Sequence, residues 1–186
     1  MTALLFALLA PLAAAQGLRI DARPNILRSA DALASTIRGQ YSDSVSDSPG
    51  RLDEKKFYYS QSALLMTALL DYWHLTDDAS ANDEVTKALL AQRDDGNFVP
   101  DSLGTSRVAN DDQCLWGMAA MLAAEAELPE PDEGSWFGVA RSVYVEQKGR
   151  LNRTDECGGG LRWGIDSQHH GSEWKSSMLA SDGGSR

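Results

Sequence analysis

Apolar residues recur at helical spacing along most of the chain, and no segment keeps the apolar–polar alternation of a strand. Within residues 26–37 the apolar positions lie three or four residues apart, at Ile26, Ala30, Leu33 and Ile37. This spacing predicts an amphipathic helix with one buried face. Residues 58–74 and 114–126 are instead apolar nearly all round. Helices of that kind are buried on most sides.

Two further helices are predicted from narrower apolar stripes. Ser80 and Asp83 form a capping-box pattern, and a short stripe follows at Val85, Ala88 and Leu89. A one-sided stripe also runs through residues 136–144, at Trp136, Phe137, Val139, Ala140, Val143 and Tyr144. The fold class is therefore all-α. Because mostly buried helices alternate with amphipathic ones, two concentric layers, inner and outer, fit the pattern better than a four-helix bundle does.

The length of the chain limits how much of such an arrangement it holds. One helix-loop-helix pair takes roughly 55–60 residues when its loops are long. The 186 residues therefore accommodate about three pairs, and a closed double ring takes about twice as many. Either the domain is an unusually small helical one, or the chain is the front part of a larger one. We expect a helical domain over residues 16–175 and an irregular tail over 176–186.

The N-terminus has the features of a targeting segment. Residues 1–15 carry no charged side chain, and Ala13 and Ala15 supply the small-x-small pattern before a predicted cleavage site at Gln16. We therefore expect a signal peptide and a secreted protein. In that pathway Asn152, in the triplet Asn-Arg-Thr, is a predicted glycosylation site. An oxidising compartment also permits a bridge between Cys114 and Cys157, whose pairing the sequence leaves open.

The charge balance excludes some functions. Lys plus Arg number 17 and Asp plus Glu number 27, which gives a formal net charge of −10. A chain this acidic repels phosphate backbones and anionic lipid surfaces, so we predict no nucleic-acid partner. His74, His169 and His170 are not spaced as metal ligands, and no phosphate-binding loop is present. We therefore predict neither a metal nor a cofactor.

Four polar residues, Asn110, Asp111, Asp112 and Gln113, stand directly before the apolar stretch 114–126. One interpretation is helix capping. Asn110 is a preferred N-cap residue, and an Asp in the first turn stabilises a helix by about 0.3–1 kcal/mol.

The other interpretation is acid–base chemistry. Neighbouring Cβ atoms at a helix start lie ~5–6 Å apart, so two carboxyl groups there approach the ~5 Å separation of a retaining glycosidase. One carboxylate would attack the anomeric carbon, and the other would protonate the leaving oxygen and then activate water. The helix N-terminus would lower the pKa of the nucleophile, whereas the acid needs burial to raise its pKa.

Tryptophans divide into core and ligand candidates. Trp73, Trp116 and Trp136 fall on helical stripes and are predicted to pack in the core. Trp163 lies beside glycines and Arg162, and aromatic faces stack on the C–H surfaces of sugars. Trp163 is therefore the stronger candidate for ligand contact.

Three blocks in order carry a resemblance to a known family: LDYWHLT at 70–76, NDDQ with WGMAA at 110–120, and CGGGLRW at 157–163. Together they resemble glycoside hydrolase family 76, the endo-α-1,6-mannanases. The fungal branch of this family is secreted or GPI-anchored and acts in cell-wall assembly. The resemblance covers most of the chain after the signal peptide, from about residue 20 to residue 174.

The resemblance implies an (α/α)6 toroid, a retaining mechanism and no metal. It implies Asp111 as nucleophile and Asp112 as general acid/base, with Asn110 and Gln113 bordering the cleft and Trp163 lining it. The implied substrate is α-1,6-linked mannan or the mannose of a GPI glycan, and the reaction is hydrolysis or glycan transfer. We expect a monomer at the cell wall or the outer face of the plasma membrane.

The sequence also departs from the family pattern. Ser60-Gln61-Ser62 follows the paired tyrosines where tryptophans are usual, Cys114 replaces a small residue, and the chain is less than half of the family's length. We therefore expect the N-terminal portion of the toroid, about five helices, without activity on its own. The alternative from another class is a non-catalytic helical glycan-binding or interaction protein. Release of oligosaccharides from mannan separates the two.

Overall fold

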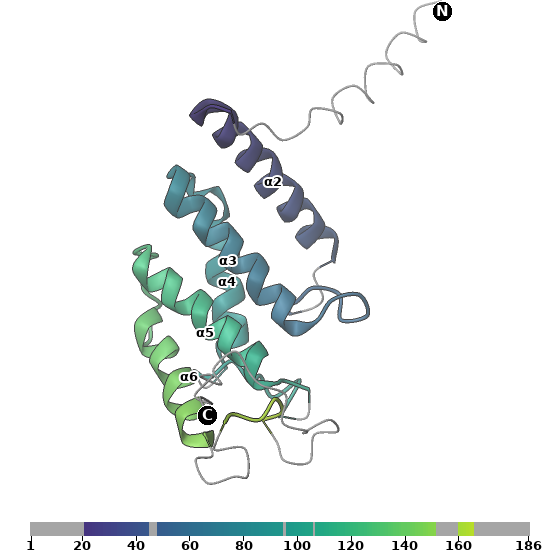
Figure 1. The fold of residues 1–186 in the computed structure, drawn as a ribbon, viewed down its shortest axis with the longest axis vertical. Coiled ribbons are helices and arrows are strands. Elements are labelled where there is room, and N and C mark those ends of the chain that lie inside the picture. Colours follow the sequence, from purple (N-terminus) through teal and green to yellow (C-terminus); the bar gives the residue numbers. More distant parts are fainter. Residues whose placement is uncertain (1–20, 45–47, 95, 106, 152–159, 166–186) are drawn as a thin grey trace, which may run out of the picture.

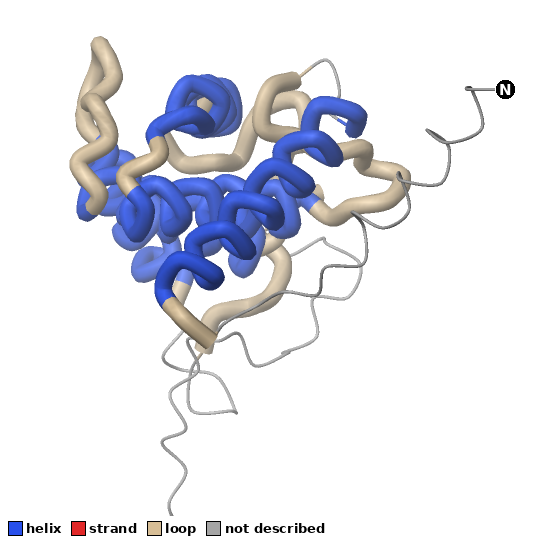
Figure 2. The backbone as a smooth tube through the Cα atoms, turned by 90° about the horizontal axis from the view of Figure 1, so that it is seen from above, coloured by secondary structure: helices blue, strands red, loops and turns tan. Residues whose placement is uncertain are grey.

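The computed structural model describes residues 21–44, 48–94, 96–105, 107–151 and 160–165. These residues form five α-helices and one short 3-10 helix: α2 (Arg23–Ser44), α3 (Tyr59–Thr76), η1 (Ala79–Ala81), α4 (Asn82–Arg93), α5 (Asn110–Glu125) and α6 (Trp136–Arg150). Within those ranges there is no strand, and an isolated antiparallel bridge joins Ala109 to Gly164. Figure 2 shows the helices linked by loops. The predictions of an all-α class and of about five helices are confirmed for this part of the chain.

The helices lie in two layers. α5 packs between α3 and α6, α4 lies against α3 and α5, and α2 packs against α3. In Figure 1, α3 and α5 run side by side in the same direction, while α2 and α6 run opposite to them. α3 and α5 are therefore neighbouring inner helices, and the amphipathic α2, α4 and α6 form the outer layer. The predicted alternation of inner and outer helices is observed.

The core lies between α3 and α5 and extends to α4 and α6. Trp116 is fully buried, with its ring centroid 5.4 Å from that of Tyr59 and 5.6 Å from that of Phe98. Trp136 is also fully buried, and Trp73 is partly buried against the core. The predicted core positions of all three tryptophans are confirmed.

Helices α5 and α6 approach each other closely at Gly117. A Cβ placed on this glycine would lie 2.9 Å from Val143 Cγ1, which is closer than two carbon atoms can pack. The alanines that follow Gly117 on the same helix are also buried: Ala119, Ala120 and Ala123. The small side chains of α5 therefore bring its backbone close to its neighbours and set the position of the whole helix, including its first turn.

The predicted buried face of the first amphipathic helix is only partly correct. Tyr41 on α2 is 7% exposed, and its hydroxyl oxygen accepts a hydrogen bond from Gly50 N at 2.7 Å. Ile26 and Leu33, however, are 46% and 47% exposed. Their half of α2 meets chiefly α3 across an apolar groove, which Leu75 also lines. Because α2 packs chiefly against α3, that one helix leaves part of the apolar stripe of α2 uncovered.

The predicted capping box at residues 80 and 83 is wrong. Asp78 instead caps η1 by accepting a hydrogen bond from Ser80 N at 3.0 Å, and α4 begins at Asn82 with Ala81 as its N-cap residue. The local reason is that a turn of 3-10 helix precedes α4, so the acidic residue before that turn takes the capping role.

Several predictions concern residues outside the described ranges. These are the signal peptide at 1–15, the tail at 176–186, the glycosylation site at Asn152 and the pairing of Cys157. Across the described ranges, none of the helices is both long enough and apolar enough to span a lipid bilayer.

Candidate active site

The four polar residues 110–113 form the first turn of α5, and their capping roles differ from those predicted. Ala109, not Asn110, is the N-cap residue. Asp112 reaches back over one turn and accepts a hydrogen bond from Ala109 N at 2.9 Å. This is the returning half of a capping box, in which the side chain three residues into the helix satisfies the N–H of the N-cap residue. The expectation that Asn110 caps α5 is therefore wrong.

The Asp112 carboxylate also ties two inner helices together. Its Oδ1 accepts a hydrogen bond from Ser60 N, in the first turn of α3, at 3.0 Å. Burial raises the pKa of Asp112, the backbone donors Ala109 N and Ser60 N oppose that rise, and the charge of Asp111 adds to it. The net direction is upward, which is the direction that a general acid needs.

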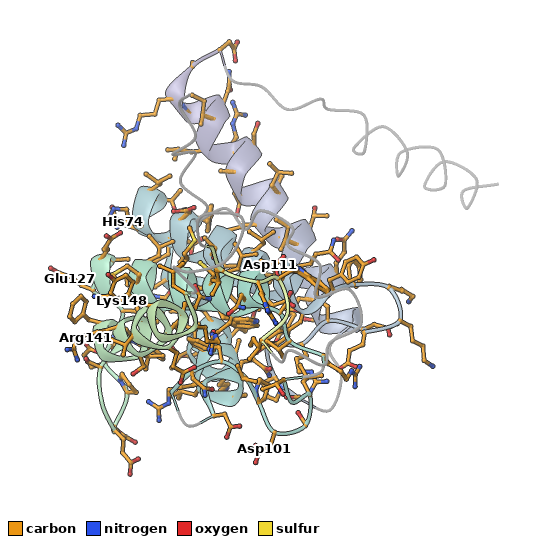
Figure 3. The ribbon with its side chains drawn as sticks, turned by 60° about the horizontal axis from the view of Figure 1, so that its bottom comes forward. His74, Asp101, Asp111, Glu127, Arg141 and Lys148 are labelled. Atoms are coloured by element: carbon orange, nitrogen blue, oxygen red, sulfur yellow. The ribbon has the colours of Figure 1, made fainter. Side chains whose placement is uncertain are left out.

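Asp111 lies beside Asp112 in a different environment. Its Oδ1 accepts from Asp112 N at 3.0 Å, and its Oδ2 accepts from the indole Nε1 of Trp163 at 3.1 Å. In Figure 3, Asp111 lies toward the middle of the view, whereas Asp101, Glu127 and Arg141 lie at the periphery. The structure therefore brings Trp163 to the adjacent pair Asp111 and Asp112, although Trp163 lies 52 residues beyond Asp111 in the sequence.

The expected place of Asn110 and Gln113 at the border of a cleft stays a prediction, and both residues are buried in the described structure. Asn110 is 2% exposed and Gln113 is fully buried. The Asn110 amide donates to Arg162 O at 2.8 Å, and the Gln113 amide donates to Asn97 O at 2.7 Å. Both side chains therefore use polar atoms in hydrogen bonds within the protein.

Residues at the end of α6 hydrogen-bond to Asn110 and Gln113, and the sequence pattern did not predict these contacts. Gln147 Nε2 donates to Asn110 O at 2.6 Å. Arg150 donates from Nε to Asn110 Oδ1 at 3.0 Å and from Nη2 to Gln113 Oε1. Glu146 accepts from Gln113 Nε2 at 3.0 Å. A signal was present: Gln147 continues the buried stripe of α6 four residues after Val143, and a polar residue at a buried position implies a polar partner.

Cys114 follows the site on α5 as a half-buried free thiol, and burial raises its pKa. Over the described residues, there is no group of three or more His, Cys, Asp or Glu side chains arranged to hold a metal ion.

The double layer of helices, with a carboxylate pair at the start of an inner helix, agrees with the α/α-type glycoside hydrolase domain that the sequence resemblance implies. The model of glycosyl hydrolase family 76 matches residues 25–182, and the chain belongs to this family. Curated relatives agree. The chain is 35% identical over 125 residues to mannan endo-1,6-alpha-mannosidase DCW1 of Saccharomyces cerevisiae, covering 66% of this chain and 27% of that protein.

Two further matches support the family and the fold. The chain is 38% identical over 82 residues to mannan endo-1,6-alpha-mannosidase DFG5 of Candida albicans, covering 44% of this chain and 18% of that protein. The solved structure of Dfg5 from Chaetomium thermophilum in complex with glucosamine matches with a TM-score of 0.75 and 35% identity, over 84% of this chain and 40% of that one. The predicted partial (α/α)6 toroid is confirmed. The chain spans about a quarter of the length of the curated relatives it matches, 27% for DCW1 of Saccharomyces cerevisiae.

Proposed function

We propose that this chain carries the catalytic carboxylates of a retaining endo-α-1,6-mannosidase, or of a transglycosidase acting on mannan or GPI-glycan mannose. Asp111 is the nucleophile and Asp112 is the general acid/base. The names of the relatives supply the substrate class, α-1,6-linked mannan. Membership of the family supplies the reaction class, cleavage of a glycosidic bond.

The observation that carries the proposal is the difference between two adjacent carboxyl groups. Asp111 has each oxygen held by one donor, Asp112 N and the Trp163 indole, which fixes the plane of the carboxylate. A carboxylate held in a fixed plane suits attack on an anomeric carbon. Asp112 has a pKa raised by burial, which suits a group that gives its proton to the leaving oxygen and later takes one from water. Two carboxyl groups with opposite tasks need such unequal environments.

The proposed place of action is the fungal cell wall, in the breakdown or assembly of mannan. It rests on the predicted signal peptide at residues 1–15 and on the predicted glycosylation site at Asn152. Trp163 is half-buried beside Asp111, and because aromatic rings stack on sugar rings, we propose it as a contact for a mannose ring.

The test uses the gene product as purified from its source, with Asp111→Asn and Asp112→Asn variants and linear α-1,6-mannan as substrate. We expect the wild type to release oligosaccharides. Each variant should lose at least ~10³-fold in kcat, because removing one member of a catalytic pair lowers kcat by about that factor.

Proton NMR of the first product should show the α-anomer, because a retaining mechanism preserves configuration. Azide should restore turnover to Asp111→Gly and give the β-mannosyl azide. Full activity in both Asn variants would show that Asp111 and Asp112 have a structural role only.

A second candidate is a non-catalytic helical glycan-binding or interaction protein. One observation favours it: both oxygens of Asp112 accept backbone N–H groups, from Ala109 and Ser60, so this carboxylate has a structural use independent of catalysis. Each oxygen still keeps a second lone pair for a proton. Mannan binding without any product, in wild type and variants alike, would support this second candidate.

A further inference from the structure

A continuous set of hydrogen bonds connects the end of α6 to Asp111. We propose that Arg150 is a positioning residue that holds the Trp163 indole on the Asp111 carboxylate, acting through Asn110. Its importance for catalysis rests on the proposed function, but the positioning itself does not.

First, Arg150 donates hydrogen bonds to two side chains in the first turn of α5. Arg150 is the last residue of α6, and its half-buried guanidinium lies beneath the first turn of α5. Nε donates to Asn110 Oδ1 at 3.0 Å, Nη2 donates to Gln113 Oε1, and Nη1 pairs with Glu146 at 3.3 Å. The planar guanidinium offers donors in fixed directions. It therefore fixes two amide oxygens at once, and with them the orientation of both amide groups.

The second step runs from Asn110 to the segment 160–165. With Oδ1 facing Arg150, the Asn110 amide nitrogen faces the opposite way and donates to Arg162 O at 2.8 Å and to Gly164 O at 3.3 Å. The backbone N–H of Asn110 donates to Trp163 O at 2.9 Å. Three bonds from one buried residue thus hold the backbone on both sides of Trp163. If the Asn110 amide were flipped, its oxygen would face the carbonyl oxygens of Arg162 and Gly164 and would repel the segment 160–165.

The third step is the indole itself. Trp163 Nε1 donates to Asp111 Oδ2 at 3.1 Å. The backbone carbonyl of Trp163 is fixed by α5 and its side chain returns to α5, so the residue is anchored at two points on the same helix turn. Without the Asn110 anchor, the segment loses the bonds that aim the indole. Asp111 Oδ2 then loses its donor, and the carboxylate gains rotational freedom.

The test follows the Trp163 indole directly by proton–nitrogen NMR of the gene product as purified from its source. Loss of one cross-peak in Trp163→Phe assigns it. In wild type we expect a downfield indole N–H peak, because the indole donates to a carboxylate oxygen at 3.1 Å. In Arg150→Met the peak should shift upfield, because the indole no longer holds that hydrogen bond. Arg141→Met is the matched control, because Arg141 is an exposed arginine on the same helix.

Kinetics supply the second readout. Misplacement of a reacting group by about 1 Å costs on the order of 10²-fold, so Arg150→Met should lower kcat on mannan by about 10- to 100-fold with KM changed less than about threefold. Arg150→Lys keeps the charge but not the planar donors, so its peak position and kcat should be intermediate. If Arg150→Met does not fold, Arg150→Lys decides by the same peak.

An unchanged indole peak in a folded Arg150 variant overturns the proposal, whatever the activity. A shifted peak with unchanged kcat would show that Arg150 positions Trp163 without any effect on catalysis. That result would overturn the proposed importance of Arg150 for kcat. If the indole peak shifts in Arg150→Met as expected but the wild type never cleaves mannan, the proposed function fails and the positioning by Arg150 stands.

Discussion

Asp112→Asn tests whether one carboxylate serves both the fold and the chemistry. Asp112 accepts one hydrogen bond from Ala109 N, at the start of its own helix, and another from Ser60 N, at the start of α3. Asparagine is isosteric but offers only one accepting oxygen. Its amide nitrogen must then face one of these two backbone N–H groups, which leaves that donor without an acceptor.

The expected cost follows from the number of bonds lost. One bond is lost, and one N–H is left without an acceptor in a mostly buried place, since Ala109 is 1% exposed. An unsatisfied buried donor costs about 1–3 kcal/mol. For a domain of 150–250 residues, each 1 kcal/mol lowers Tm by about 2–4 °C. We therefore expect Asp112→Asn to lower Tm by about 2–12 °C at acidic pH.

The pH dependence has a definite sign. Burial raises the pKa of Asp112 in the folded state above its unfolded value. Between these two values the folded protein binds more protons than the unfolded one, so wild-type stability falls as pH rises through this window. Asparagine does not titrate there. The gap in Tm between wild type and Asp112→Asn should therefore be largest below the unfolded pKa of about 3.9, and it should narrow as pH rises past the folded pKa.

The assay is thermal unfolding by far-UV circular dichroism in matched buffers from pH 3.5 to pH 7.5. Asp83→Asn is the control, because Asp83 is exposed in the first turn of α4 and its loss also removes one negative charge at a helix start. Subtracting the change in Tm of Asp83→Asn from that of Asp112→Asn removes the contribution of the helix dipole. Equal Tm values for the two variants would refute the tie between α3 and α5. A gap that widens with rising pH would refute the raised pKa.

Three further substitutions test the packing by the same unfolding measurement. Gly117→Ala should lower stability by about 1–3 kcal/mol, because the new Cβ would overlap the stiff Val143 side chain; an unchanged Tm would mean that α6 can move away. Tyr59→Phe should be neutral or stabilising by up to about 1 kcal/mol, because the buried Tyr59 hydroxyl has no hydrogen-bond partner among the described residues; a large loss would reveal a partner. Arg38→Met should cost less than about 1 kcal/mol, because its pairing with Glu84 is partly exposed; a larger loss would show that this pair anchors α2.

The sequence predicted the fold class well because helical periodicity is a local property. The stretches that are apolar nearly all round became α3 and α5, the two inner helices, and the narrower stripes became outer helices. The prediction failed where burial depends on a neighbour. Ile26 and Leu33 have the spacing of a buried face, yet both stay about half exposed because α2 meets chiefly α3. A periodic pattern indicates which face prefers burial, but it does not indicate how much of that face a partner covers.

The sequence indicated the acidic pair of the candidate site, whose catalytic role stays a prediction, but it did not indicate the residues that support the pair. Asp111 and Asp112 were identifiable from residue type and from their place at a helix start, both of which are local. Arg150 is 37 residues beyond Gln113 and 40 beyond Asn110, and no local pattern links it to them. Contacts of this kind depend on the packing of α6 against α5, and only the buried Gln147 gave a hint of them.

The sequence left capping and catalysis as alternatives, and Asp112 both caps α5 in the structure and is the general acid/base that we propose. Asn110 turns inward to hold the segment that bears Trp163, and Asp112 takes over the capping of α5 by accepting from Ala109 N. Burial is what makes Asp112 both a useful tie between helices and a carboxyl group with a raised pKa. A substitution there changes stability and proton transfer together. Loss of activity in Asp112→Asn is therefore informative only at temperatures where its unfolding curve shows the variant to be folded, whereas Asp111 tests the chemistry more directly.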